Sequence, residues 1–511
     1  KKKKSVLTMK TRLRMYCVSC LVTLGTVQLS AQTYHWIHSS ENDTWQESTV
    51  RLKSEVNTLP DVSVDEKAKI TTFKTWGVTF NELCWDALGV LTREEQDEIL
   101  KKVFAPDGDL RIGRGRISLG ANDYARSWYS CDEVEGDFEL RYFNIDRDKQ
   151  AIIPFIRAAQ KYNPALTFWV SPWSPPSWLK INGDYPVLSS PANHLSPKLD
   201  YLLYGNVGGT TDPDEMKLVG ERKGKFPRQL ATTDYMIQDP RYLRTYANYF
   251  CKFIDAYKAE GIPIDMVMYQ NEAYSYTPYP GCAWTAEGTI LFNRDYLAPA
   301  LKKAHPEVKL YLGTLNTNRQ DHVEKILSDK QLQDCISGMG FQWEGREILS
   351  AIRQQHPDWS YICSESECGW GSFDWKSGEH TFELINHYLG NGCNEYNLWN
   401  FILSDEGTST WGWKQNALIR VDSKTRTFTY TPEYFAVKHY AHYITSGSEV
   451  LAYKPEGDDK KPVLVVKTPA QKYVVIAGNF KEDSQKLTVK LGKRYLEVVL
   501  APHSMNTFEM K

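Results

Sequence analysis

The chain has few of the residues that bind transition metals. Its 511 residues include 11 histidines and 10 cysteines, and the eight cysteines after residue 31 form no Cys-x-x-Cys pair. A zinc site is therefore not expected, and we predict no metal and no cofactor. Disulfides can form in oxidising compartments, but eight scattered cysteines fit buried free thiols equally well, so their pairing stays open.

The sequence also has no excess of positive charge and no long apolar run. It carries 61 Lys and Arg against 63 Asp and Glu. Residues 1–14 hold seven basic side chains, and the apolar run 15–27 and Leu29-Ser30-Ala31 follow. This pattern predicts an export signal cleaved near Ala31, and thus a periplasmic or extracellular protein. The run is too short for a membrane span. Removing residues 1–31 changes the formal charge from −2 to −9, so binding to nucleic acid is not expected either.

Aromatic residues are abundant, with 16 Trp and 30 Tyr. Sixteen tryptophans exceed the usual need of core packing. Aromatic rings stack on the weakly apolar CH faces of sugars, although many of these rings must simply fill a core. The composition fits a large soluble enzyme that handles carbohydrate.

Short apolar runs alternate with amphipathic segments along the middle of the chain, as in a (β/α)8 barrel. The helical segments are 94–104, 149–162, 242–260 and 382–389. The predicted strands are 76–80, 115–119, 166–170, 264–269, 308–312, 336–341, 360–363 and 396–401.

Both ends of the chain have a different period. Alternating or β-branched runs at 463–467, 473–480, 486–491 and 495–510 predict antiparallel strands, and 33–70 also looks extended. We therefore predict a signal peptide at 1–31, a TIM barrel at 71–440, and an antiparallel β-sandwich side domain built from 32–70 and 441–511.

Two of the predicted strands lead into a glutamate. Tyr269-Gln-Asn-Glu272 and Tyr361-Ile-Cys-Ser-Glu365 both place a carboxylate at the edge of a core, where it is costly unless it is used or paired. Such a Glu is often only an edge residue or half of an ion pair. In a barrel, however, both would lie at the active-site face, and a facing pair of carboxylates can break a glycosidic bond. The other strand ends add polar and aromatic groups: Asn122-Asp123, Trp173, Gln342-Trp343-Glu344 and Trp399-Asn400.

Several motifs resemble glycoside hydrolase family 30, the glucosylceramidase-like enzymes. The most specific is the Pro-dense stretch Ser171-Pro-Trp173-Ser-Pro-Pro176-Ser-Trp178. Arg116-Ile-Ser-Leu-Gly120, Tyr279-Pro-Gly-Cys282 and Trp411-Gly-Trp413-Lys-Gln-Asn416 continue the resemblance, which covers roughly residues 70–510. It implies a retaining β-glycosidase with a β side domain.

The resemblance also implies roles for individual residues. Glu272 matches the acid/base, Asn271 the residue that hydrogen-bonds the sugar 2-hydroxyl, and Glu365 the nucleophile. Glu367 is the alternative nucleophile, because period-two alternation in a continuing strand would place both side chains on one side. Glu365 is preferred because the residues before it fit the family pattern.

Substrate-binding positions follow in the same way. Asp123, Trp173 and Trp399 match residues that line the family's sugar pocket. Two departures stand out: Ala273 replaces a proline after the acid/base, and Gln342-Trp343-Glu344 replaces His-Trp-Tyr. Trp343 and Glu344 are predicted to bind substrate, and Glu344 adds a carboxylate that can contact hydroxyls or shift a catalytic pKa.

The sequence thus predicts a secreted retaining β-glycosidase that acts on a β-linked glucoside or oligosaccharide. An endo-β-1,6-glucanase or a β-xylosidase or β-fucosidase of the same family are alternatives, as is a catalytically inactive carbohydrate-binding protein. The long segment 182–237 after the third strand is predicted to form a wall of the pocket.

Overall fold

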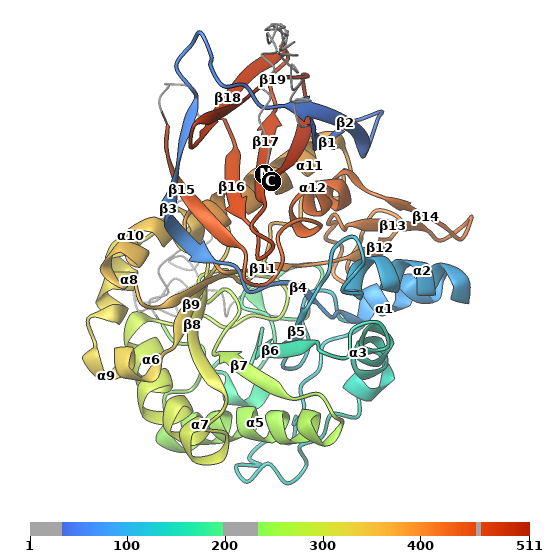
Figure 1. The fold of residues 1–511 in the computed structure, drawn as a ribbon. Coiled ribbons are helices and arrows are strands. Elements are labelled where there is room, and N and C mark those ends of the chain that lie inside the picture. Colours follow the sequence, from blue (N-terminus) through green and yellow to red (C-terminus); the bar gives the residue numbers. More distant parts are fainter. Residues whose placement is uncertain (1–32, 198–232, 456–460) are drawn as a thin grey trace, which may run out of the picture.

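The computed structural model describes residues 33–197, 233–455 and 461–511; the predicted export signal at 1–31 lies outside them. The described chain forms a barrel and a sheet domain that packs against one side of it (Figure 1). Among the described residues, no helix is both long and apolar enough to cross a membrane. The eight cysteines after residue 31 are free thiols, and all but Cys335 are buried.

Eight parallel strands close the barrel, so the predicted TIM barrel is confirmed. Each predicted run overlaps one strand, because each is a short apolar segment that is buried on both faces. In chain order the strands are β4 Thr75–Thr79, β5 Arg114–Ser118, β6 Thr167–Ser171, β7 Ile264–Met268, β8 Lys309–Leu315, β9 Gly338–Phe341, β10 Ser360–Cys363 and β11 Glu395–Leu398.

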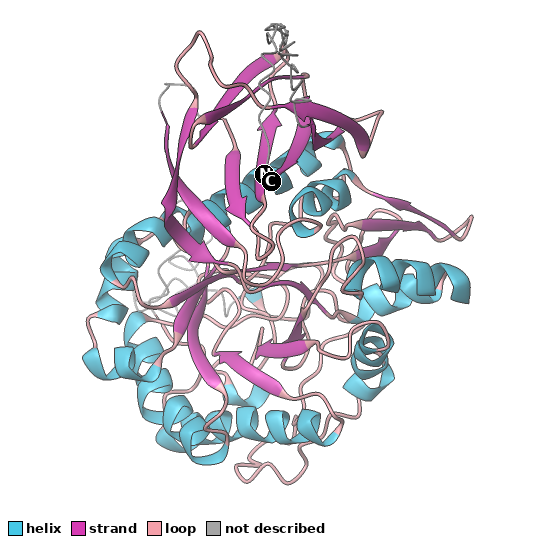
Figure 2. Cartoon of the chain, viewed as in Figure 1, coloured by secondary structure: helices cyan, strands magenta, loops and turns pink. Residues whose placement is uncertain are grey.

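Helices surround the barrel (Figure 2). Their starts carry the expected signals: Thr92 and Glu95 form a capping box before α2, and Asp239 caps α5, which begins on Pro240. The α-helices are α1 Glu82–Gly89, α2 Arg93–Phe104, α3 Ile152–Gln160, α5 Pro240–Ala259, α6 Ala286–Leu291, α7 Ala298–Ala304, α8 Gln320–Leu327, α9 Lys330–Cys335, α10 Leu349–Gln355, α11 Trp375–Gly390 and α12 Pro432–Ala441. Short helical turns are η1 Asp148–Gln150, η2 Ser177–Leu179, η4 Phe292–Leu297 and η5 Trp343–Glu347.

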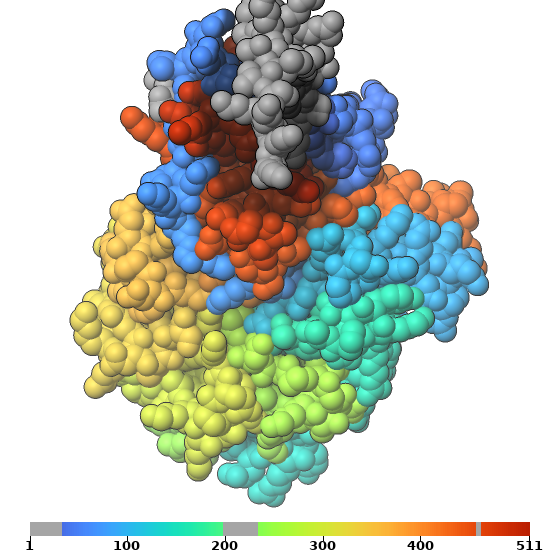
Figure 3. Space-filling model, viewed as in Figure 1, coloured from blue at the N-terminus to red at the C-terminus, as the bar shows by residue number. Residues whose placement is uncertain are grey.

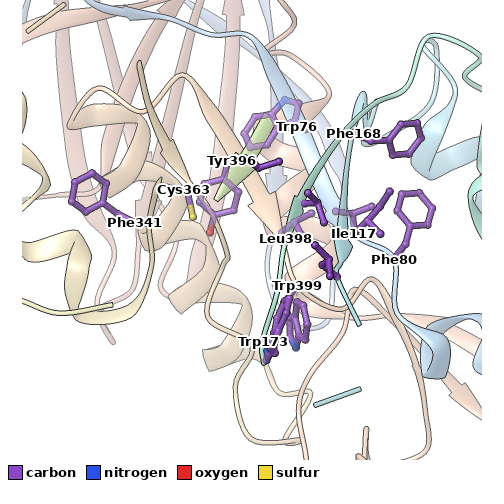
Figure 4. Close-up of a cluster of buried hydrophobic side chains, with 14 of the residues drawn as sticks. Trp76, Phe80, Ile117, Phe168, Trp173, Phe341, Cys363, Tyr396, Leu398 and Trp399 are labelled. Carbon is purple, nitrogen blue, oxygen red and sulfur yellow. The ribbon is translucent and has the colours of Figure 1, made fainter. Parts of the chain in front are cut away.

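Successive side chains of β5 point alternately into the barrel and toward the surrounding helices. Ile117 packs in the large core with Phe80 and Phe168 (Figure 4). The side chain of Arg116 points the other way, into the barrel, where it lies over the Trp169 ring. A charged side chain therefore points into the barrel from β5, whose first residue, Arg114, is also charged and pairs with Asp265 and Glu395.

The side domain is a nine-stranded sheet in the order β19-β18-β3-β15-β16-β17-β20-β1-β2. All its pairings are antiparallel except the parallel pair β18–β3. Strands from both ends of the described chain join in it, with β3 between β18 and β15 and β1 next to β20, so blue and red segments share one lobe (Figure 3). The strands are β1 Thr33–Ser39, β2 Gln46–Arg51, β3 Val62–Thr72, β15 Glu449–Pro455, β16 Val463–Lys467, β17 Tyr473–Asn479, β18 Gln485–Leu491, β19 Arg494–Leu500 and β20 Ser504–Met510.

The side sheet is buried on both faces. Val463 and Val465 of β16 belong to a core enclosed by the sheet itself. The alternate residues Leu464 and Val466 belong to the large core shared with the barrel. The two edges of the sheet approach each other through a bridge between Lys53 and Tyr495, so the sheet curls over its own core. A small sheet of β12 Ile402–Ser404, β13 Ile419–Asp422 and β14 Thr427–Tyr430 extends from the barrel beside it.

Candidate active site

A pocket of about 530 Å³ opens where the loops after the barrel strands meet. This is the end of a TIM barrel that carries active sites. Almost all of the predicted site residues line it: Asp123, Trp173, Asn271, Glu272, Trp343, Glu344 and Glu365. The same face of the barrel thus brings together residues that lie up to 242 positions apart in the sequence.

Glu272 stands just after β7 in a left-handed backbone conformation, with φ of 48°. Its backbone N–H donates to Thr314 Oγ1 at 3.0 Å, and its side chain accepts a hydrogen bond from Gln342 Nε2 at 2.9 Å. A left-handed non-glycine residue is strained, and such strain gathers at functional sites. The residue is 7% exposed, and this burial raises the pKa of Glu272. The Glu344 carboxylate raises it further, whereas hydrogen bonds and Arg116 oppose the change.

Asn271 is held with its amide in one orientation. Its Oδ1 accepts hydrogen bonds from Arg116 at 2.7 Å, from Thr314 at 3.2 Å and from Gln342 at 3.3 Å. With Oδ1 occupied, the Nδ2 group has no partner among the described residues, and Asn271 lines the pocket. Asn271 can therefore donate to a ligand hydroxyl.

Glu365 lies in the loop just after β10 and forms an ion pair with Arg116, whose guanidinium is completely buried. Burial raises the pKa of Glu365, and the neighbouring carboxyls of Glu272 and Asp123 add to the rise. Arg116 opposes it by stabilising the ionised form. Because an arginine stays protonated, the ion pair favours a charged Glu365.

Asp123 and Trp173 form part of the buried pocket wall. Asp123 is 4% exposed, and burial, assisted by Glu272, raises its pKa to about 7. Trp399 stacks on Trp173 with ring centroids 5.2 Å apart (Figure 4). It does not line the pocket as predicted; it lies behind Trp173, and Gln415 accepts its indole N–H at 2.8 Å. Trp399 thus packs against a pocket-lining residue and does not itself reach the pocket. A position after a barrel strand predicts the face of the barrel, but not whether the side chain reaches the pocket surface.

Glu367 lies outside this pocket. Its carboxylate pairs with Arg346 and with His380, the latter at 2.7 Å. The expectation that Glu365 and Glu367 share one side was wrong, because β10 ends at Cys363 and strand alternation does not continue into the loop. The structure places Glu365 in the pocket and Glu367 in an ion pair on the far side of that loop.

Three buried carboxyls, on Asp123, Glu272 and Glu365, thus surround a single buried cation, Arg116. No lysine, arginine or histidine lines the pocket in the described part of the chain. Three ionised carboxylates in such a space would be strongly unfavourable, so the site retains protons at neutral pH. Such a site suits chemistry that needs one acid and one carboxylate together.

The family model described as the glycosyl hydrolase family 30 TIM-barrel domain matches residues 73–189 and 213–444. The chain belongs to glycosyl hydrolase family 30. It is therefore a glycoside hydrolase, as predicted from its motifs.

Relatives of the family 30 chain agree with this placement. The lysosomal acid glucosylceramidase of Mus musculus is 24% identical over 82% of this chain and 77% of that protein. Two solved structures share the fold: SrfJ from Salmonella typhimurium has a TM-score of 0.78, 18% identity, and coverage of 94% of this chain and 100% of the other. The endo-β1,6-glucanase BT3312 has a TM-score of 0.72, 21% identity, and coverage of 93% and 99%.

Two residues of the stretch that departs from the family pattern, Trp343 and Glu344, line the pocket. Trp343 begins η5 in a left-handed conformation with φ of 47°, and the exposed Glu344 follows it into the pocket lining. Of the predicted wall 182–237, the described part contributes Leu188, whose N–H pairs with the carbonyl of Thr277 at 3.0 Å. Residues 198–232 lie outside the described residues, and the family model leaves 190–212 unmatched.

Sequence reasoning did not assign roles to Arg116 or Gln415, although both lie in motifs that it used. Gln415 Oε1 accepts from Trp399 and from Asn400, each at 2.8 Å, so its Nε2 group remains to face the pocket that it lines. Arg116 lies within the run 115–119, which was predicted only as a strand, so its charge was given no role. A charge flanked by apolar strand residues was the signal that could have revealed it.

Proposed function

We propose that this family 30 enzyme is a secreted, retaining β-glycosidase that hydrolyses β-glucosidic bonds by double displacement. The main support is the unequal environment of the two pocket glutamates. Glu365 forms an ion pair with the buried guanidinium of Arg116, whereas Glu272 accepts hydrogen bonds from the neutral side chains of Gln342 and Ser275. Glu365 is then the charged nucleophile and Glu272 the protonated acid.

In the first step, Glu365 attacks the anomeric carbon while Glu272 gives its proton to the departing oxygen. The bond from the anomeric carbon to that oxygen breaks, and an ester to Glu365 forms. The Nδ2 group of Asn271 donates to the sugar 2-hydroxyl, and Asp123 accepts from other hydroxyls of the same ring. Trp173 provides an apolar wall beside them.

In the second step, Glu272 acts as a base. Esterification removes the negative charge of Glu365, and the two carboxyls are coupled, so the pKa of Glu272 falls once the ester has formed. Glu272 can then take a proton from water as the water attacks the anomeric carbon. The sugar leaves with its original configuration, and Glu365 returns to its ion pair with Arg116.

A β-glucoside is the proposed substrate because the relative described above is a glucosylceramidase and that fold neighbour is a glucanase. The pocket volume of about 530 Å³ suits one sugar and part of its leaving group. Export is proposed from the basic and apolar segment at 1–31, and a mature N-terminus near residue 32 would support it.

The nucleophile is tested with Glu365→Ala and Glu367→Ala. The first variant should lose hydrolysis of an aryl β-glucoside by about four orders of magnitude or more, and azide should restore turnover as an α-glucosyl azide. Glu367→Ala should remain active, since its partners Arg346 and His380 lie outside the pocket. Azide rescue of Glu367→Ala, without rescue of Glu365→Ala, would reverse the assignment.

The acid/base is tested with Glu272→Gln, which keeps the shape of the side chain. Hydrolysis of a β-linked disaccharide should fall about 10³-fold, and that of an aryl glucoside with an acidic phenol much less, because such a leaving group needs little protonation. Equal activity of variant and parent on the disaccharide would exclude this role. Binding of the disaccharide without turnover by the parent would instead indicate a binding protein.

A further inference from the structure

Aromatic rings continue outward from the pocket along one side. We call Tyr279, Trp411, Trp413 and Trp370 the aromatic rim. Neighbouring ring centroids lie 4.7 Å apart for Tyr279 and Trp411, 5.0 Å for Trp411 and Trp413, and 5.0 Å for Trp413 and Trp370. Tyr279, Trp413 and Trp370 line the pocket, and Trp411 packs between Tyr279 and Trp413. The rim is thus a continuous wall of tilted rings.

Trp370, the outermost ring of the rim, is exposed because of the backbone conformation around it. Trp370 is 67% exposed, and both of its neighbours have left-handed φ angles, 58° at Gly369 and 80° at Gly371. Glycine adopts this region without strain, so the Gly-Trp-Gly turn displays the indole. At Gly371, a Cβ would come within 2.7 Å of the carbonyl oxygen of Glu406, so the turn also lies tightly against the loop that carries Trp411 and Trp413.

The two loops of the rim are tied together. The Asn416 N–H donates to the carbonyl of Cys368 at 2.6 Å, and its Oδ1 accepts from the Phe373 N–H at 3.3 Å. Asn416 Nδ2 in turn donates to the buried Glu433. The Trp413 loop closes on itself, since Ser409 exchanges hydrogen bonds with the backbone of Trp413. The rings are therefore positioned before any ligand arrives, which lowers the entropy cost of binding.

The rim leads away from the catalytic carboxyls toward solvent. Burial raises the pKa of Tyr279, and the nearby charges of Glu272, Asp123 and Glu365 raise it further. Tyr279 therefore forms the inner end of the aromatic rim. Trp370 marks the outer end. A sugar bound by Asp123, Trp173 and Asn271 occupies the buried part, and the remainder of the substrate must follow the rim outward.

We propose that the aromatic rim is a leaving-group subsite that stacks on the second sugar ring of a β-linked oligosaccharide. This inference rests on the proposed glycosidase function and adds the class of leaving group. Flat rings beside polar groups suit a sugar, which has apolar faces and hydroxyl edges, and Glu344, Gln415 and Asn316 supply such groups in the same pocket. Among its described lining residues, only Leu188 and Pro278 are aliphatic, which is unlike a groove for an alkyl chain.

The test compares two substrates that differ only in the leaving group. Gentiobiose releases glucose, whereas β-D-glucosyl fluoride releases an ion that cannot reach the rim. In Trp413→Ala and Trp370→Ala, the ratio of kcat/KM for gentiobiose to that for the fluoride should fall about tenfold, the loss expected for one stacked ring. Trp370→Phe keeps an aromatic face and should restore most of the ratio. Tyr142→Ala is a matched control, because Tyr142 is 63% exposed and does not line the pocket.

Other outcomes are informative too. An unchanged ratio in both alanine variants would overturn the proposal. So would a tenfold selective loss with octyl β-D-glucoside but not with gentiobiose, which would identify an alkyl subsite instead. If the parent cleaves none of these compounds, the proposed function fails separately. The rim is then tested by tryptophan fluorescence with gentio- and xylo-oligosaccharides: quenching that Trp370→Ala reduces supports it, and no quenching contradicts it.

Discussion

At the scale of single residues, the site depends on how three carboxyls share one guanidinium. Arg116 donates to Glu365, to Asn271 and to Ser171, and its guanidinium lies 4.4 Å from the Trp173 ring. One side chain therefore orients the proposed nucleophile, the proposed 2-hydroxyl ligand and the sugar wall. The guanidinium is fully buried, and its planar set of N–H donors reaches all three partners at once. Lysine could not make the same hydrogen bonds, so an Arg116→Lys variant should lose activity.

Glu344 gives a pH-dependent prediction. Its carboxylate raises the pKa of Glu272, so removing the charge in Glu344→Gln should lower that pKa. Since Glu272 must be protonated to act as the acid, the alkaline limb of the kcat/KM profile should move to lower pH, while the acidic limb stays in place. The pH profile for an unactivated disaccharide checks this.

The height of the same profile tests the other role predicted for Glu344. A hydrogen bond from a sugar hydroxyl to this carboxylate would make the plateau fall about tenfold in Glu344→Gln. An unchanged plateau with a shifted alkaline limb would assign Glu344 to tuning Glu272 alone. An alkaline limb that stays in place would contradict the electrostatic role.

Single residues also show where sequence reasoning stopped. Glu272 and Glu365 could be placed at strand ends because their apolar leads are distinct. The orientation of Glu367 could not, since it depends on the end of β10 at Cys363 and on Arg346 and His380, which come from other elements. The depth of Trp399 depends in the same way on its stacking with Trp173. Contacts between distant segments leave no local pattern to read.

At the scale of elements, the loops after β6 and β7 are joined by one buried lysine. Lys180 is 2% exposed and donates through Nζ to the carbonyls of Tyr185 at 2.6 Å and Gly281 at 2.8 Å. The bridge between Pro186 and Pro280 lies beside it. Leu188 and the segment Thr277–Tyr279 on either side line the pocket, so Lys180 holds part of the pocket wall in place.

Lys180→Met should loosen this wall. Two buried carbonyls would lose their charged donor, so the free energy of unfolding should fall by about 2–4 kcal/mol. KM should rise more than kcat falls, because the carboxyls and Arg116 are untouched. Lys252→Met is the matched control: Lys252 also donates to a carbonyl, that of Leu140, but does not line the pocket. Equal effects of the two variants on KM would contradict the role of Lys180.

The elements themselves were largely predictable. Each predicted barrel strand overlaps an observed one, and most predicted helices lie within a few residues of the observed ones. The side sheet was predicted as antiparallel, and the parallel pair β18–β3 could not be foreseen. That pair joins segments more than 400 residues apart, and β-strand propensity does not encode which neighbour a strand selects.

At the scale of the whole molecule, the barrel and the side sheet share one core. Val450, Leu464 and Met505 of the sheet belong to the same buried cluster as Trp76 and Phe382 of the barrel part. His439 of α12 joins them by polar contacts: its Nδ1 lies 2.8 Å from Thr507 Oγ1 and its Nε2 2.9 Å from Ser39 Oγ. Since Thr507 donates its own proton to the His439 carbonyl, Nδ1 must be the donor and Nε2 the acceptor in the neutral ring.

His439 should therefore make the joined molecule sensitive to acid. Burial lowers its pKa to about 3, so between pH 6.5 and 3 the unfolded state binds more protons, and stability falls as the pH falls. At pH 4 this costs on the order of 3 kcal/mol. His439→Gln can bond both hydroxyls without titrating, so the drop in unfolding free energy between pH 7 and pH 4, measured with urea, should be smaller by about that amount. His35→Gln, which removes a half-buried histidine of the same sheet, is the control variant. An equal drop in parent and His439→Gln would show that this histidine is not what makes the interface acid-sensitive.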